Sequence, residues 1–423
     1  MRKKRVLLSA MVLTVCFVGM NVFAEAETET PPVTEAAAEE TTEAAAEKAA
    51  KADEPETNSL GIVMAEQWSE KYPNEVESYM KNKDNSEAYS YVEAHPEIAT
   101  LYEGMGFAFD YNSARGHSYT LEDVQATTRP HALSNCLACK TADYVALLNK
   151  YGTDFYSMSF EDAVAEMEEP ITCYDCHTND PSEGPAPIRQ AMINAVGDDY
   201  DSISPSTLAC AQCHNEYYFE PENKSVDHPY RGLDEMNPDA ILAYYNEIGF
   251  TDYQNPRTLT NQIKVQHPEF ETVMGEGSAH KTMTCAQCHM EKTEDADGNA
   301  YTSHYWVSPL ASESIMENTC VTCHGDADIV TAKVTATQAA VTARETEVGE
   351  LLKELTDKLA EAVESGEYSE DELEEIRALN RDAQFYWDFV FVENSEGAHN
   401  SLLSRNCLDK SQELAGEAMA LLK

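Results

Sequence analysis

Residues 136–140 of the chain read Cys-Leu-Ala-Cys-Lys, and four later stretches repeat this order with histidine in the last place. These Cys-x-x-Cys-His stretches lie at 173–177, 210–214, 285–289 and 320–324. In c-type haem attachment, two cysteines at this spacing form thioether bonds to the haem, and the residue that follows binds the iron. The sequence therefore predicts five covalent haem c groups, one of which differs in its axial residue.

The first motif is unusual because Lys140 stands where the other four motifs have histidine. Lysine binds a metal ion only as the free amine, since metal and proton compete for the same lone pair, and the pKa of a buried lysine shifts readily. The first haem is thus expected to differ electronically from the others. This asymmetry is typical of one catalytic haem supplied with electrons by four relay haems.

Other uses of paired cysteines fit this chain poorly. A single Cys-x-x-Cys is more often a zinc knuckle or a redox dithiol, but zinc sites need paired knuckles. Five motifs that each continue with histidine or lysine do not pair in that way, and adjacent cysteines rarely form a disulfide framework. Ten of the twelve cysteines belong to the motifs, leaving Cys16 in the leader and Cys407, which we expect to be a small buried hydrophobic residue.

The N-terminal residues have the pattern of an export signal. A basic start is followed by an apolar run from Val6 to Ala24, which predicts a signal peptide over residues 1–24. An uncleaved membrane anchor is the alternative. Residues 25–58, almost entirely Ala, Glu, Thr and Pro, predict a disordered acidic tether. Export to the periplasm or the outer face of the cytoplasmic membrane agrees with the motifs, because haem is attached covalently outside that membrane.

The formal net charge of -47 excludes nucleic acid as a partner. It also means that an anionic substrate would need a locally positive approach to its site.

Residues 59–423 are expected to form one catalytic domain. We predict a mostly α fold, a multihaem cytochrome c with five covalently bound haems packed among helices and with long C-terminal helices from about residue 326. Strand signals are scarce. Helices are predicted at Ser59 onward, Asn237 to Gly249, about Asp326 to Glu364, Ser369 to about Phe391, and after Ala398.

The long stretch after the last motif has a heptad pattern. Its apolar positions recur every seven residues at Val334, Val341, Val348 and Leu355, with a second row at Leu352 and Leu359. This seam fits either packing within the chain or a homodimer face.

Relay haems usually have both axial positions filled, so four histidines outside the motifs are expected as distal ligands. Twelve histidines less the four in the motifs leave eight, namely His95, His117, His131, His228, His267, His280, His304 and His399.

Three short segments beside the motifs carry a family resemblance. They are Arg-Gly-His at 115–117, His-Asn-Glu-Tyr-Tyr-Phe at 214–219 and Lys-Val-Gln-His-Pro at 264–268. Together with the order of one lysine motif and four histidine motifs, they resemble the pentahaem cytochrome c nitrite reductases, the ammonia-forming cytochrome c-552 family, from about residue 60 to the end. The resemblance implies six-electron reduction of nitrite to ammonium, a homodimer, and a membrane-associated quinol-oxidising cytochrome c as electron donor.

The resemblance also implies roles for single residues. Lys140 would be the proximal ligand of the active-site haem, whose open face would be lined by the catalytic residues Arg115, Tyr217 and His267. The distal ligands would be His304 for the second motif, His117 for the third, His399 for the fourth and His280 for the fifth, leaving His95, His131 and His228 without a role. The remaining haem-binding residues would be Cys136, Cys139, Cys173, Cys176, His177, Cys210, Cys213, His214, Cys285, Cys288, His289, Cys320, Cys323 and His324.

A calcium site is implied next to this pocket. Its ligands would be the Glu216 side chain, the backbone carbonyls of Tyr217 and Lys264, and the side-chain oxygen of Gln266. Such hard oxygen donors suit calcium. Family members without calcium use a basic side chain in its place, so Glu216 and Gln266 favour the metal.

The chemistry of the three pocket side chains agrees with an anionic substrate. Arg115 offers a permanent cation and several donors, His267 can be cationic near neutral pH and so deliver protons, and the Tyr217 hydroxyl donates without charge.

Two alternatives remain open. One is a non-catalytic electron-transfer cytochrome, and the other is a related multihaem enzyme acting mainly on hydroxylamine or sulfite.

Overall fold

The computed structural model of the protein describes residues 55–106, 113–127 and 133–422. The expected signal peptide, most of the expected tether and His131 lie outside the described residues. The last two residues of the stretch expected as a tether make specific contacts, since Thr57 forms a β-bridge with Val63 and Asn58 Nδ2 donates to Asp143 Oδ1 at 3.0 Å.

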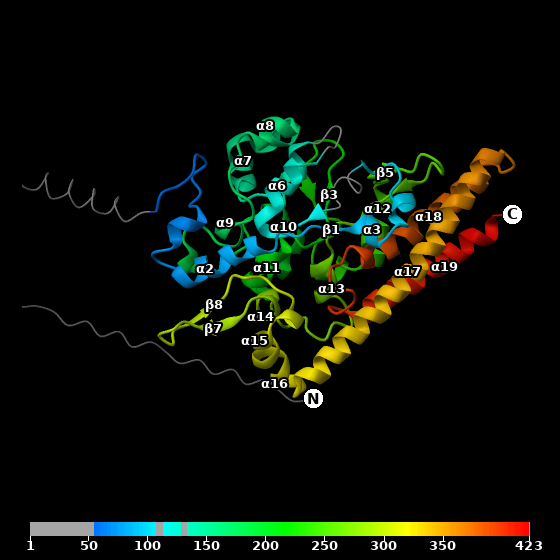
Figure 1. The fold of residues 1–423 in the computed structure, drawn as a ribbon. Coiled ribbons are helices and arrows are strands. Elements are labelled where there is room, and N and C mark those ends of the chain that lie inside the picture. Colours follow the sequence, from blue (N-terminus) through cyan, green and yellow to red (C-terminus); the bar gives the residue numbers. More distant parts are fainter. Residues whose placement is uncertain (1–54, 107–112, 128–132, 423) are drawn as a thin grey trace, which may run out of the picture. The chain divides into compact units, whose positions relative to one another are not determined.

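Three long helices at the C-terminal end lie side by side: α17 (Ala327–Ser365), α18 (Glu370–Phe391) and α19 (Ser401–Leu421) (Figure 1). Their ends have local sequence causes. The Asp326 side chain caps α17 by accepting from the Ile329 amide, and Gly366 ends it at φ +65°. Ser369 and Glu372 form a reciprocal capping box at the start of α18. All three helices predicted for this region are confirmed.

The heptad positions of α17 are buried within the chain. Val341, Val348, Leu352, Leu355 and Leu359 belong to the main core, whereas Val334 is only half-buried. The core also contains side chains of α18 and α19, such as Trp387, Phe385 and Leu408. This row therefore packs against the neighbouring helices, and the homodimer face stays a prediction.

Shorter helices make up most of the remaining structure. The expected helix at Asn237 is confirmed as α12, with the Asn237 side chain as its cap. The region after Ser59 begins instead with a 3₁₀ turn at Ala65–Trp68 and reaches an α-helix only at Pro73. Within the described residues, the α-helices before α17 are α2 (Pro73–Met80), α3 (Tyr91–Ala94), α4 (Ile98–Leu101), α6 (Thr120–Gln125), α7 (Asp143–Tyr151), α8 (Phe160–Val164), α9 (Cys173–Cys176), α10 (Gln190–Val196), α11 (Pro205–Ala211), α12 (Pro238–Glu247), α13 (Glu269–Met274), α14 (Cys285–His289), α15 (Glu313–Ile315) and α16 (Val321–His324).

Strands are short and occur in the described residues only as two-stranded antiparallel pairs. The pairs are β1 (Tyr89–Ser90) with β2 (Ser113–Ala114), β3 (Tyr218–Phe219) with β4 (Val226–Asp227), β5 (Tyr253–Gln254) with β6 (Asn261–Gln262), and β7 (Lys292–Glu294) with β8 (Ala300–Thr302). The fold is thus mostly helical, as predicted.

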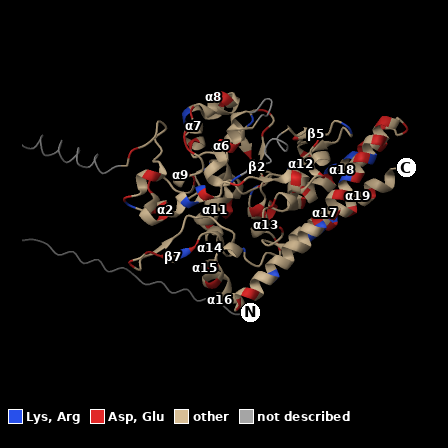
Figure 2. Cartoon of the chain, in the orientation of Figure 1, with Lys and Arg blue, Asp and Glu red and all other residues tan. Residues whose placement is uncertain are grey.

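Acidic side chains are spread over helices along the whole described chain and are not gathered in one segment (Figure 2). Among the helices of the described residues, none has the length and apolar character needed to span a membrane.

Candidate functional site

Four of the five motifs are carried on short helices. The second motif begins α9, the third begins at the end of α11, the fourth forms α14 and the fifth runs into α16. Capping boxes fix the start of α9 through Thr172 and Asp175, and of α14 through Thr284 and Gln287. One helical turn places cysteines three residues apart on the same face, as attachment to one haem requires.

The first motif has a different local structure. Its first two residues end a 3₁₀ turn, Ser134–Leu137, and Leu137 and Ala138 are buried in a second core cluster with α7 and α8. The backbone carbonyl of Lys140 accepts a hydrogen bond from Thr120 Oγ1 at 2.8 Å, and the same hydroxyl donates to the carbonyl of His117 at 2.9 Å. Thr120 therefore ties the lysine motif to the segment that carries Arg115 and His117.

Contacts between cysteines show which motifs are adjacent to one another. The thiols of Cys139 and Cys213 lie within hydrogen-bonding reach, as do those of Cys210 and Cys285. Cys176 and Cys210 also interact electrostatically. The third motif is therefore adjacent to the first, second and fourth motifs.

The fifth motif adjoins the fourth, because Cys320 and Cys288 also interact electrostatically. Among the described residues, Cys139 and the eight motif cysteines that follow it form no disulfide. Their thiols remain available for thioether bonds.

Each histidine of the four downstream motifs faces a second imidazole from elsewhere in the chain. The ring centroids are separated by 6.2 Å for His177 and His304, 5.9 Å for His214 and His117, 6.1 Å for His289 and His399, and 6.1 Å for His324 and His280. Two imidazoles that bind one metal ion from opposite sides, at metal–nitrogen distances of about 2.0 Å, hold their ring centroids about 6 Å apart. The four pairs fit a haem iron between them.

His214 has a second ring at a similar distance, because His267 lies 6.2 Å away. The orientation of His214 indicates which of the two neighbouring rings would share its metal ion. Its Nδ1 faces Glu269 Oε1 at 3.5 Å, and Glu269 lies two residues after His267. An iron ligand with Nδ1 turned to a carboxylate uses Nε2 for the metal, which favours His117 as the opposite ring.

Other histidines of these pairs are also oriented through Nδ1. His304 Nδ1 lies 2.9 Å from the Thr302 carbonyl, and His289 Nδ1 lies 3.0 Å from the Val307 carbonyl. His399 differs, since its Nδ1 lies 2.5 Å from the carboxylate oxygen Oε1 of Glu393. Hydrogen bonds of this kind fix the tautomer that leaves Nε2 for iron.

Two of the three expected pocket residues lie close to the lysine motif. Tyr217 is near Cys139 and Cys136, and burial, followed by the charges of these cysteines, raises the pKa of its phenol well above the ordinary value. His267 is near Lys140: burial lowers the pKa of His267 to about 4, and the Lys140 charge adds to the shift. The structure thus brings Tyr217 and His267 to the first motif.

The protonation state of His267 differs from the sequence expectation. With a pKa of about 4 this imidazole is neutral at pH 7, and its buried Nδ1 has no hydrogen-bond partner. The physical reason is that a cation in a buried place is costly unless an anion accompanies it. A bound anion would oppose this shift.

Arg115 makes its ion pairs with α6. Among the described residues, its guanidinium contacts Asp123 Oδ1 at 2.6 Å and Glu122 Oε1 at 2.8 Å, and it lies 4.1 Å above the Tyr119 ring. Two carboxylates therefore offset the positive charge that was expected to draw in an anion.

The residues expected to bind calcium are neighbours around Glu216. This carboxylate is fully buried, and it accepts from the backbone N–H of Gln266 at 2.6 Å and from the Tyr245 hydroxyl at 2.8 Å. The Gln266 side chain in turn reaches the Lys264 carbonyl at 2.8 Å. Burial, opposed in part by these hydrogen bonds, raises the pKa of Glu216 well above its usual range.

A cation at this place would compensate the buried charge, so the donor set fits calcium. This donor set consists mainly of carbonyl and amide oxygens. Within the described part of the chain, no cluster of three or more His, Cys, Asp or Glu side chains is arranged to hold a metal ion.

Several side chains of the site carry no sequence signal. Glu393 and Glu269 face the histidines His399 and His214, yet they belong to no motif. Arg189 forms a buried ion pair with Asp175 at 2.8 Å, between the second motif and the cysteines of the first and third. The spacing of charges in the sequence could not have identified any of them.

His95 and His228, two of the histidines left without a role, have other neighbours. His95 Nδ1 is 3.5 Å from Glu97, and His228 is buried next to Tyr230. Cys407 is buried, as expected.

Short motif helices, four facing imidazole pairs and long C-terminal helices define a multihaem c-type cytochrome. The chain matches the family model for cytochrome c552 over residues 64–423, and it belongs to that family. Among solved structures it is similar to the catalytic subunit of cytochrome c nitrite reductase from Desulfovibrio desulfuricans, with 26% identity, a TM-score of 0.75, and coverage of 85% of this chain and 86% of that one. That catalytic subunit has two calcium sites.

Two further solved structures are less similar. One is the outer cell wall cytochrome OcwA, with 21% identity, a TM-score of 0.38 and coverage of 71% and 48% of the two chains. The other is an undecahaem cytochrome from the S-layer of Carboxydothermus ferrireducens, with 18% identity, a TM-score of 0.36 and coverage of 71% and 40%. Nothing about function follows from these two.

Proposed function

We propose that this chain is an exported pentahaem enzyme that reduces nitrite to ammonium at the haem of the lysine motif. The observation that carries the proposal is the division of the motifs. Each of the four motif histidines faces a second imidazole, while the motif of Lys140 adjoins two buried groups that can donate hydrogen bonds, Tyr217 and His267. Membership of the cytochrome c552 family and the similarity to a nitrite reductase support it.

The haem-binding residues follow from the same division. The ten motif cysteines would hold five haems, with Lys140 as one axial ligand and the four histidine pairs as the others. When bound, the first haem would supply the iron that takes up nitrite and the electrons that reduce it. The arrangement of the motifs supports electron supply through the third motif, because this motif adjoins both the first and the fourth.

The protein's own side chains would bind the anion and deliver protons. Tyr217 offers a hydroxyl donor at the first motif, and His267 offers an imidazole whose proton affinity rises once an anion is beside it. Arg115 would supply charge only if Asp123 and Glu122 leave it a donor for the substrate. Calcium at Glu216 and Gln266 would add positive field and hold the Tyr217 and His267 segments together.

The electron donor is proposed to be a membrane-associated quinol-oxidising cytochrome c, and the working form a homodimer. The periplasm or the outer face of the cytoplasmic membrane is proposed as the location, because covalent haem attachment takes place outside that membrane.

The test is a steady-state assay of the haem-loaded protein with a reduced dye, in which nitrite loss and ammonium formation are measured together. We expect one ammonium per nitrite. A protein that accepts electrons from the dye but leaves nitrite unchanged would instead be an electron-transfer cytochrome. Faster turnover of sulfite or hydroxylamine than of nitrite would favour the other alternative.

A further inference from the structure

His289, His304 and His399 hydrogen-bond through Nδ1, and their partners are of two chemical kinds. His304 and His289 face neutral backbone carbonyls through Nδ1, at 2.9 Å and 3.0 Å. His399 faces a carboxylate oxygen of Glu393 at 2.5 Å. A carboxylate that accepts from the Nδ1 proton makes the opposite ring nitrogen a stronger electron donor, which stabilises the oxidised metal more than the reduced metal.

The loop between α18 and α19 holds Glu393 firmly in place. Ser395 Oγ donates to Glu393 Oε2 at 2.6 Å and accepts from the His399 amide at 3.0 Å. Gly397, at φ +82°, lies so close to α17 that an added Cβ would come within 2.6 Å of the Val341 side chain. Asn400 closes the loop by capping α19 and donating to the carbonyls of Thr272 and Glu276. These contacts of the loop fix the position of the carboxylate.

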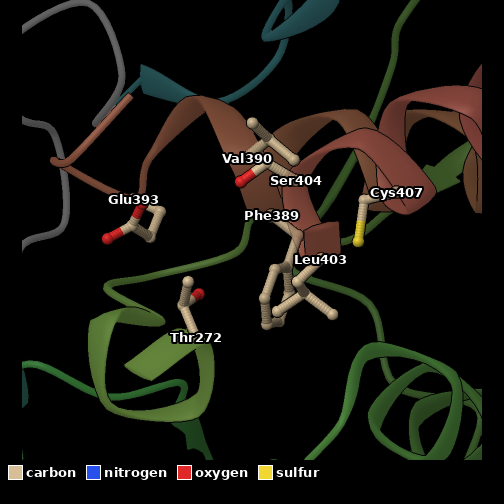
Figure 3. A pocket seen from close by; sticks show the side chains of 7 residues that line it. All are labelled: Thr272, Phe389, Val390, Glu393, Leu403, Ser404 and Cys407. Atoms are coloured by element: carbon tan, nitrogen blue, oxygen red, sulfur yellow. The ribbon is translucent and has the colours of Figure 1, made fainter. Parts of the chain in front are cut away.

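The surroundings of Glu393 strengthen its effect. The side chain is 3% exposed, and it lines a small hollow with Thr272, Phe389, Val390, Leu403, Ser404 and Cys407 (Figure 3). Most of these side chains are apolar, so water screens the charge poorly and its field at His399 is larger than at the protein surface.

The same loop reaches the neighbouring motif. Asn394 Nδ2 donates to Glu269 Oε1, the oxygen that faces His214 Nδ1 at 3.5 Å. Glu269 is thus held between the loop and the third motif, but its distance from the imidazole is greater than a normal hydrogen bond. The stronger influence falls on the fourth motif.

We infer that Glu393 is a positioning and tuning residue that holds the haem of the fourth motif at a lower reduction potential than a haem whose histidines face only carbonyls. The inference rests on the proposed ligation of iron by His289 and His399. It goes beyond the proposed function because it assigns a relative reduction potential to one relay haem. A low potential at the fourth motif makes this haem a strong reductant for the third, which adjoins the lysine motif.

The test is redox titration of the haem-loaded protein, with each haem followed by its optical and magnetic circular dichroism bands. Glu393→Gln keeps the shape and removes the charge, and should ease reduction of one bis-histidine haem by at least tenfold in the equilibrium constant, which is about 59 mV for a single electron. Ser395→Ala removes the donor that draws charge away from His399, and should shift the same haem in the opposite direction. Glu396→Gln, an exposed acid of the same loop, is the control and should shift none.

Three outcomes decide the matter. Opposite shifts of one haem in the two variants would support the inference. Unchanged potentials in both variants, in a protein whose bands count four bis-histidine haems, would overturn it and leave the proposed function intact. Fewer than four bis-histidine haems in the unaltered protein would overturn the proposed ligation and the inference together.

Discussion

At the scale of single residues, His267 is the group whose role is most open to direct test. Its imidazole is buried, neutral and close to the lysine motif. If it delivers a proton during reduction, His267→Asn should lower kcat by about 10² to 10⁴, the usual contribution of a general acid, with only a modest change in KM. Steady-state rates over a range of nitrite concentrations measure both constants. Turnover at the unaltered rate would show that protons reach nitrite by another route.

Arg115 should behave differently, because a fixed cation assists both capture and reduction of an anion. We expect Arg115→Ala to lower kcat/KM through both constants, by no more than the ~10² to 10³ typical of losing one oxyanion donor. The loss should be smaller than for a free cation, since Asp123 and Glu122 already neutralise part of its charge. As a control, His304→Ala should alter the spectrum of a relay haem and the rate of electron delivery. If Arg115→Ala loses haem while its KM stays unchanged, Arg115 has a structural role.

Removal of calcium tests the third group of residues. Glu216→Gln, or treatment with a chelator, should lower turnover more than haem content, because the metal would hold the pocket segments and not the cofactors. Glu222→Gln, an exposed acid of the same region, is the matched control and should leave both unchanged. Metal analysis must confirm the loss of calcium. Full activity without it would remove the metal from the proposed site.

How far the sequence could define the site depends on the kind of residue. The four histidines expected opposite the motifs lie at ring distances that fit shared iron, and their ligation of that iron stays a prediction. The carboxylates behind them could not be foreseen. Glu269 comes to face His214 at 3.5 Å only when distant segments pack, and Glu393 reaches His399 through the conformation of the loop between α18 and α19, which no sequence pattern marks. The neutral state of His267 likewise follows from burial.

At the scale of elements, α17 carries a buried carboxylate that should make stability depend on pH. Burial raises the pKa of Glu345 to about 7, from about 4.5 in an unfolded chain. The folded state therefore binds the proton more tightly than the unfolded chain does. The contribution of this group to the free energy of unfolding is fully present below pH 4.5 and is lost as the pH rises through 7. Glu345→Gln should remove this loss, raising the free energy of unfolding at pH 8 on the order of 1–3 kcal/mol, at ~1.4 kcal/mol per pKa unit.

The measurement is thermal unfolding of the haem-loaded protein at pH 5 and pH 8. The gain in Tm for Glu345→Gln should be clearly larger at pH 8. Glu350→Gln, on the exposed side of the same helix, is the control and should give no such difference. An equal gain at both pH values would show that the carboxylate is not protonated in the folded state.

Elements were predictable where a long amphipathic pattern and a capping residue coincide. This is why α12, α17, α18 and α19 lie where expected, with Asn237, Asp326, Ser369 and Asn400 as caps. The region after Ser59 was not foreseen in detail, because its 3₁₀ turns and four-residue helices are fixed by contacts with distant segments, such as the Tyr79 hydroxyl on the Ile171 carbonyl. Short motif helices have too few residues to show a period.

At the scale of the whole molecule, we expect the purified protein to contain five covalent haems, one of them high-spin or weakly ligated. The reason is that, of the five motifs, only the lysine motif lacks a histidine in its last position. Intact-protein mass and the ferric spectrum measure both properties. A mass that corresponds to four haems, with residues 136–140 unmodified, would contradict the prediction. A lysine motif also requires a suitable attachment enzyme, so the expression host must provide one.

The spacing of the ring pairs along the chain bears on how the protein is assembled. The partners of the third and fifth motifs, His117 and His280, precede them in the sequence, whereas the partners of the second and fourth, His304 and His399, follow by more than a hundred residues. A chain that leaves the cytoplasm N-terminus first would present the third and fifth motifs with partners already outside. The second and fourth motifs would acquire haem while their partners, His304 and His399, were still in the cytoplasm. If the four ring pairs bind iron, maturation would then pass through a stage with two incompletely ligated haems. A released chain truncated at residue 300, which lacks His304 and His399, should therefore be more sensitive to peroxide bleaching than the full-length protein.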